Sequence, residues 1–161
     1  MNQTLEQLID ESIKLELNVA GVYKIFLNTF PEDSELWSKL IREEEKHADL
    51  IQSMRSSFLL PRQFPSDLLA SPMKMLKKTN NRLVSILKKY NKEQPLRESA
   101  FKVALDIERS AGEFNFQLAT EKLPDSGIMK IFQALNKDCR NHTEKINIYM
   151  NNKGIRLEVD K

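Results

Sequence analysis

The chain has 161 residues, of which 40% are hydrophobic and 30% are charged, and its formal net charge at pH 7 is +2. This length predicts one domain spanning residues 1–161, and the composition is typical of a folded helical protein and not of a disordered one. With only 4 Gly, 6 Pro and a single Cys, a turn-rich β fold is disfavoured and an internal disulfide is excluded.

Residues 3–57 predict a helical hairpin. Apolar residues recur at helical spacing over 3–29, and Pro31 ends this helix because proline disfavours helical geometry in the residue before it. A second helix begins in the acidic stretch after Pro31, where carboxylates suit the positive end of the helix dipole. Its apolar stripe predicts that it continues to about residue 57.

Residues 58–94 predict a long crossover, because three prolines interrupt its first part. A third helix lies within the crossover at about 72–91. The region from 72 to 92 contains no acidic residue and seven basic ones: Lys74, Lys77, Lys78, Arg82, Lys88, Lys89 and Lys92. A basic amphipathic helix can bind an acidic partner or a membrane surface. We favour the simpler interpretation, in which the apolar side of this helix packs on the bundle and its lysines are solvated, so we do not expect a membrane partner. We expect no nucleic-acid partner either, since Tyr90 is the only aromatic residue there.

Residues 95–152 predict a second helical hairpin. Its helices cover about 95–121 and 128–152, and Gly154 is a suitable C-terminal stop. The two hairpins and the long connection between them predict an all-α fold, a four-helix bundle with one crossover that contains an extra helix.

Both histidines of the chain occupy matching places in the two hairpins. In the first hairpin, Glu16 on one helix is followed by Glu44 and His47 on the next, and in the second hairpin Glu108 is followed by His142. Glu44 and His47 are three residues apart, so one helix offers both side chains to the same side. The helical pattern places all five on apolar faces.

Buried carboxylates without a compensating partner are costly, and a divalent cation between the helices would compensate these. Carboxylate and imidazole groups are suitable ligands of iron and manganese. Taken singly, Glu16 or Glu108 is more simply a boundary residue that reaches water, and His47 an interior histidine with hydrogen-bond partners. The three glutamates at 43–45 could be a solvated charge run. The conjunction of the five in matching helices favours a metal site.

These residues resemble the ferritin-like superfamily and, within it, the rubrerythrin-like branch. Residues 12–16 with Tyr23, followed by 44–47, resemble the first pair of ligand-bearing helices, and 104–108 with His142 resemble the second pair. The resemblance covers about 3–152 and implies a di-iron centre, with manganese or zinc as alternatives. It implies that Tyr23 is a hydrogen-bond donor or electron relay next to the metals.

The same resemblance implies a division of the ligands between two metal positions. Glu16, Glu44 and His47 would bind one metal, Glu108 and His142 would contribute to the other, and the glutamate at the Glu44 position normally bridges both.

The second half departs from the family pattern. Cys139 stands where a glutamate is expected three residues before His142. A thiolate can bind iron or zinc, but a buried cysteine is more often a small core residue. Asp138, four residues before His142, could reach the site with its shorter side chain. Ala111 stands where rubrerythrins carry a further glutamate, and no four-Cys rubredoxin module is present, so a standard rubrerythrin peroxidase is disfavoured.

The function predicted on these grounds is a metal-binding oxidoreductase that acts on peroxide, dioxygen or Fe(II). We expect a cytoplasmic protein, because we find no signal peptide and no apolar run long enough for a membrane span. We further expect a homo-oligomer, with a dimer favoured, and an electron-donor protein as a partner. The alternative is a non-enzymatic helical bundle with a degenerate metal site, in which the basic crossover helix binds a partner or a membrane. A storage-type cage subunit is a third interpretation.

Overall fold

The computed structural model describes residues 3–57, 70–120 and 127–157. Within these ranges the protein is all-helical, with five α-helices, one 3-10 turn and no strand. The elements are α1 (Gln3–Thr29), η1 (Pro31–Asp33), α2 (Ser34–Ser57), α3 (Ala70–Tyr90), α4 (Arg97–Thr120) and α5 (Gly127–Lys153). The proline-rich first part of the predicted crossover, 58–69, lies outside the described residues.

The predicted helix boundaries are confirmed to within two residues, and local chemistry explains them. Pro31 ends α1 and opens the 3-10 turn. The helix predicted from about residue 95 begins at Arg97, two residues after Pro95. At the end of α5, Gly154 has φ 67°, and Ile155 N–H donates to the Met150 carbonyl at 2.9 Å. This pattern is a Schellman cap, which favours glycine because other residues rarely adopt a positive φ.

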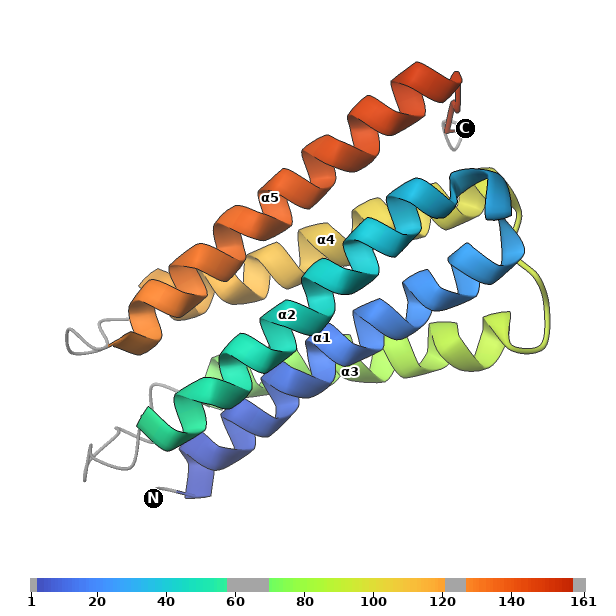
Figure 1. Ribbon diagram of the computed structural model, residues 1–161. Helices are drawn as coiled ribbons and strands as arrows, with labels where there is room; N and C mark the ends of the chain where they lie inside the picture. The colour runs from blue at the N-terminus through green and yellow to red at the C-terminus, as the bar shows by residue number, and fades with distance from the viewer. Residues whose placement is uncertain (1–2, 58–69, 121–126, 158–161) are drawn as a thin grey trace.

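The helices α1 and α2 form one hairpin, and α4 and α5 form another that lies beside it (Figure 1). Across the two hairpins, α2 runs antiparallel to α5, since Asp33 lies next to Tyr149 and His47 lies next to Asp138. α3 packs on α1 and α4, and over the described residues it contacts neither α2 nor α5. α3 therefore does not cover the side of the protein on which α2 and α5 meet.

An aromatic cluster forms the core at one end of the hairpins. The Trp37 ring is fully buried, and its centroid lies 5.6 Å from Tyr23, 5.1 Å from Phe26 and 4.9 Å from Phe101. Burying one such side chain contributes about 2 kcal/mol or more to folding. Because the cluster joins α1, α2 and α4, it fixes how these three helices face one another.

An ion pair beside this cluster joins three elements. Asp33, fully buried in η1, accepts hydrogen bonds at 2.8 and 2.6 Å from the guanidinium of Arg97 at the start of α4. The Tyr149 hydroxyl of α5 lies 3.0 Å from the same carboxylate. A bidentate arginine–carboxylate pair is geometrically specific, so it sets the register of α4 and α5 against the first hairpin.

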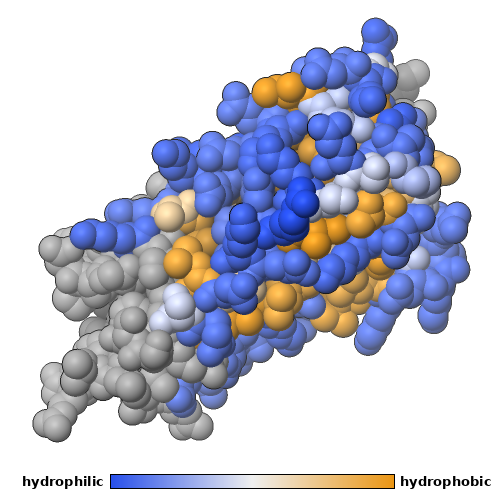
Figure 2. Space-filling model, viewed as in Figure 1, coloured by the Kyte–Doolittle hydropathy of each residue, from blue (hydrophilic) through white to orange (hydrophobic). Residues whose placement is uncertain are grey.

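Hydrophilic side chains dominate the face formed by α1, α2 and α5, and apolar side chains show only in strips between them (Figure 2). Among the described residues, no helix holds an apolar segment of the length that a membrane crossing requires.

Candidate metal centre

All five residues predicted to face inward are buried. Glu16 on α1, Glu44 and His47 on α2, Glu108 on α4 and His142 on α5 are each at most 7% exposed. The predicted inward orientation is therefore confirmed. Each of these four helices supplies at least one of the side chains, and α3 supplies none.

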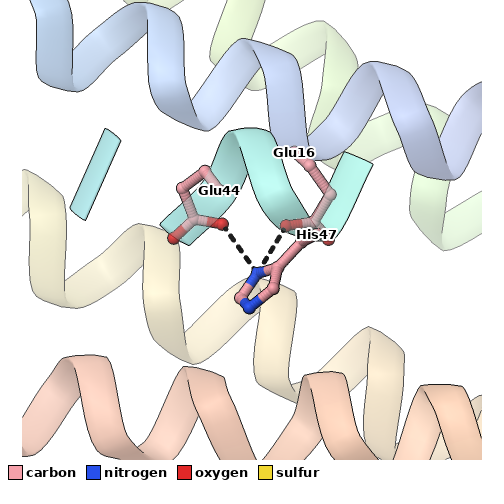
Figure 3. Close-up of side chains that lie close together, drawn as sticks. All are labelled: Glu16, Glu44 and His47. Atoms are coloured by element: carbon pink, nitrogen blue, oxygen red, sulfur yellow. Dashed lines mark hydrogen bonds and ion pairs between the residues drawn. The ribbon is translucent and has the colours of Figure 1, made fainter. Parts of the chain in front are cut away.

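The first group of three joins α1 and α2. The Nδ1 atom of His47 lies 3.4 Å from an oxygen of Glu16 and 3.3 Å from Oε2 of Glu44 (Figure 3). The spacing of one helical turn between Glu44 and His47 directs both side chains to one side of α2, where Glu16 meets them from the neighbouring helix.

The second group of three uses the other oxygen of the same glutamate. Oε1 of Glu44 lies 2.9 Å from Nδ1 of His142, and Oε2 of Glu108 lies 3.3 Å from that nitrogen. In each group, one potential ligand atom per residue lies within 4.8 Å of the others. The rings of His47 and His142 are stacked, with centroids 5.5 Å apart. Glu44 is thus shared, with one oxygen toward each histidine.

The outer nitrogens of the two histidines contact carboxylates from the opposite hairpin. Nε2 of His47 on α2 lies 3.2 Å from Asp138 on α5, and Nε2 of His142 on α5 lies 2.9 Å from Glu43 on α2. A carboxylate on the outer nitrogen fixes the orientation of an imidazole and keeps the other nitrogen available to a metal. The two contacts are reciprocal, because each carboxylate precedes the histidine of its own helix by four residues.

These contacts change the position predicted for Asp138 and add a residue that sequence reasoning missed. Asp138 lies on the outer side of His47 and belongs to neither group of three. Glu43 is not among the residues that the sequence predicts for the site. The signal that could have identified it is the repeated spacing, an acid four residues before each histidine in both halves.

Cys139 and Tyr23 occupy different surroundings. Cys139 is buried in the apolar core and belongs to neither group of potential ligands among the described residues, which agrees with its interpretation as a small core residue. The buried Tyr23 hydroxyl donates a hydrogen bond to Oε1 of Glu108 at 2.5 Å. Glu108 therefore has one oxygen held by Tyr23 and the other directed at His142.

The charges of the site depend strongly on one another. Burial raises the pKa of Glu16 to about 8, and burial together with the negative charge of Glu44 raises the pKa of Glu108. Burial also opposes ionisation of Glu44, but the two imidazoles outweigh it, so the pKa of Glu44 lies well below its usual range.

The pKa values of the two histidines shift in the direction opposite to the usual effect of burial. Burial alone would lower their pKa values, but the carboxylates around them raise the pKa of His47 to about 11 and that of His142 to about 10. Protons on the two Nδ1 atoms thus supply positive charge between the carboxylates. A bound cation would supply the same charge and release those protons.

A cation shared by Glu44 and His142 would give two buried polar atoms a partner. Oε1 of Glu44 and Nδ1 of His142 are 2.9 Å apart, within ion-pair distance, and among the described residues both are buried atoms without a hydrogen-bond partner. Buried polar atoms normally have partners. Two carboxylates and an inner imidazole nitrogen in each group are donors of the kind that iron, manganese and zinc bind, so the residues fit a metal at each group.

A pocket of about 390 Å3 opens between α2 and α5 beside the two histidines. Its lining consists of charged residues, one leucine and the histidines themselves: Glu43, Lys46, His47, Leu50, Asp138, His142 and Lys145. Lys145 donates to Glu43 at 2.7 Å, which places this ion pair next to the outer edge of His142. The pocket connects the buried site with the surface on the side opposite α3.

Comparison of the chain with protein-family models, with curated proteins and with solved structures finds no significant match. The structure is compatible with a ferritin-like fold. The resemblance therefore rests on the ligand pattern and on the geometry above.

Proposed function

We propose that this protein is a ferritin-like four-helix bundle that binds two divalent metal ions, with iron as the functional metal, and acts as an oxidoreductase on peroxide, dioxygen or Fe(II). In this proposal α1, α2, α4 and α5 are the four ligand-bearing helices, and α3 is the extra helix of the crossover. The distribution of the buried Glu and His side chains over those four helices supports the assignment.

The observation that carries the proposal is the placement of Glu44 between two histidines from different hairpins. One metal would be held by Glu16, Glu44 and His47, and the other by Glu44, Glu108 and His142. Bound iron would supply reversible one-electron chemistry toward peroxide, dioxygen or further Fe(II).

The protein's own residues have three tasks around this centre. Glu43 and Asp138 orient the two imidazoles through their outer nitrogens. Tyr23 holds one oxygen of Glu108 and is the hydroxyl that can deliver a proton to that carboxylate. The pocket between α2 and α5 admits small molecules to the edge of a site whose ligands are otherwise buried.

Iron loading followed by functional assay tests the proposal. Metal-free protein is incubated anaerobically with excess Fe(II), desalted and analysed for iron, and Fe(II) oxidation is then followed with peroxide and with dioxygen. We expect two iron ions per chain, with the second bound more weakly, and oxidation faster than in buffer. Iron retention and oxidation no greater than those of Glu44→Gln would contradict the proposal.

A second candidate function is a non-enzymatic bundle derived from such a protein. Its support is that both nitrogens of each histidine already face carboxylates, so the buried charges compensate one another through protons. Cys139 in place of a fourth carboxylate also favours it. The iron-loading experiment separates the two, because this candidate predicts no retained iron and unchanged thermal stability on metal addition.

A further inference from the structure

The outward side of α3 is a continuous basic surface. The exposed side chains among the described residues of α3 are all basic or uncharged polar: Lys74, Lys77, Lys78, Asn81, Arg82, Ser85, Lys88 and Lys89. At 100° per residue these positions fall within an arc of about 140°. From the first to the last lysine the surface extends about 22 Å along the helix axis.

The net charge of α3 is positive, whereas the net charge of the rest of the chain is negative. α3 carries six basic residues and no acidic one, out of 25 basic and 23 acidic residues in the protein. The remaining residues therefore number 19 basic and 23 acidic, a formal net charge of −4. The net charge of +2 conceals a strong separation of charge between α3 and everything else.

Two neighbouring helices extend the basic surface, and their acids are already engaged. On α1, Lys14 lies 3.7 Å from Glu11, and Glu11 accepts a hydrogen bond at 2.8 Å from Asn80 of α3. On α4, Asp106 lies between Arg82 of α3, at 3.8 Å, and Arg109, at 3.9 Å.

The five lysines of α3, in contrast, have no carboxylate of a described residue in ion-pair distance. Lys89 lies over the Tyr90 ring, 5.8 Å from its centroid, and none of the five charges is neutralised by a described acid.

The apolar side of α3 is already used within the fold. Met73, Leu76 and Leu83 are buried against the hairpins, and Asn80 bonds to α1. The helix therefore has no apolar face left to insert into a bilayer. Binding through α3 would be electrostatic and confined to the outer surface of a partner.

The composition of the surface decides which partner fits. Protein interfaces draw their affinity from aromatic and arginine anchors and are depleted in lysine, whereas five of these six basic residues are lysines. Binding of single-stranded nucleic acid needs aromatic stacking platforms, and none of the exposed described side chains of α3 is aromatic. A straight row of lysines on one side of a helix matches a flat, anionic plane, and clusters of four to eight basic residues on a helix are typical of acidic-phospholipid recognition.

We propose that the α3 surface binds the headgroups of acidic phospholipids at a membrane surface, without insertion. The proposal goes beyond the metal centre and does not depend on it, because α3 supplies none of the buried Glu and His side chains. It also departs from the expectation drawn from the sequence, that the lysines are only solvated.

A matched pair of variants tests this. In the first, Lys74→Gln, Lys78→Gln and Lys88→Gln remove three of the six positive charges of the α3 surface. In the control, Lys39→Gln, Lys130→Gln and Lys137→Gln remove three exposed charges from α2 and α5, which do not contact α3. Gln and Lys have similar helix propensities, so both variants should fold, and circular dichroism verifies this.

Co-sedimentation is measured with vesicles of phosphatidylcholine alone and with phosphatidylserine added, at low and at physiological salt. We expect binding only to the phosphatidylserine vesicles, weakened by salt, reduced about tenfold or more in the α3 variant and nearly unchanged in the control. No binding at low salt, or equal losses in both variants, would overturn the proposal. So would tighter binding to duplex DNA than to the vesicles in the same buffer, which would identify a nucleic-acid surface.

Discussion

α2 carries Glu44 three residues before His47, and α5 carries Cys139 three residues before His142, yet both imidazoles direct Nδ1 at Glu44. The first half has an inward carboxylate of its own on each helix, Glu16 and Glu44. The second half supplies Glu108, and the other carboxylate near its histidine is Glu44 of the first half, through the second oxygen of that side chain. The orientation of the imidazoles is nevertheless conserved between the halves, because each outer nitrogen faces an acid of the opposite hairpin. Orientation and ligand number are thus separate properties of this site.

The comparison predicts that Glu44 is the one residue whose loss affects both metal positions. Glu44→Gln removes a ligand from each, so we expect both affinities to fall by more than the roughly 10–100-fold cost of losing an outer hydrogen-bond partner. Glu16→Gln and Glu108→Gln should each weaken one position only. Titration calorimetry with Mn(II) measures this, and Glu45→Gln, a neighbouring half-exposed acid paired with Lys24, is the control. If Glu44→Gln weakens metal binding at only one position, as Glu16→Gln and Glu108→Gln should, Glu44 is not shared between the two positions.

The two acids that contact the outer imidazole nitrogens should affect metal affinity to different extents. Glu43→Gln should weaken metal at the His142 position by about 10–100-fold, because Glu43 lies 2.9 Å from His142 and is held by Lys145. Asp138→Asn should weaken the His47 position less, since its contact is longer, 3.2 Å, and its side chain is 46% exposed. The same titration checks both variants. An effect of either on the position of its own helix's histidine would refute the crossed arrangement.

A glutamate at position 139, three residues before His142, should make the metal affinities of the two positions more similar. Cys139→Glu is expected to tighten the second position by about tenfold and to lower the thermal stability of the metal-free protein, because it adds a buried acid without a partner. Cys139→Ser is the control for loss of the thiol and should do neither. If Cys139→Glu and Cys139→Ser bind metal alike, position 139 is not directed at the site.

The pH dependence of stability tests the charge state of the two histidines. The folded pKa values of His47, about 11, and His142, about 10, lie above the ordinary value of 6.5. Their stabilisation is fully present below about pH 6.5 and is lost as pH rises to 10–11. Glu16, with its pKa raised from 4.5 to about 8, acts in the same direction between those values. The Tm of the metal-free protein should therefore fall from pH 6 to 10.

Metal binding should remove much of this pH dependence, because a cation replaces the protons on the histidines. The difference in Tm between metal-loaded and metal-free protein should accordingly widen as pH rises from 6 to 8. Differential scanning calorimetry at matched ionic strength measures both curves. A Tm of the metal-free protein that rises over this range would show that the imidazoles are not held in their charged form.

Much of the site was predictable from sequence because it depends on helical periodicity. Apolar spacing fixes which side of α1, α2, α4 and α5 faces inward, and this placed Glu16, Glu44, His47, Glu108 and His142 on buried faces. The prolines and Gly154 similarly fixed the helix ends. These are local signals, each read within a few turns of one helix.

The crossed contacts could not be derived in that way. That Asp138 lies on His47 and Glu43 on His142 depends on the register between α2 and α5, which is set partly by the distant Asp33–Arg97–Tyr149 cluster. The packing of α3 on α1 and α4 depends on tertiary contacts in the same way, and only that packing shows which of its lysines face outward.

Anomalous X-ray scattering from crystals grown with Mn(II) or Fe(II) tests the central claim most directly. The account predicts two peaks about 4 Å apart, on either side of the Glu44 carboxylate, one within ligand distance of His47 Nδ1 and the other of His142 Nδ1, with the second the weaker. Metal only at surface carboxylates, with no peak within reach of Glu44, would contradict it.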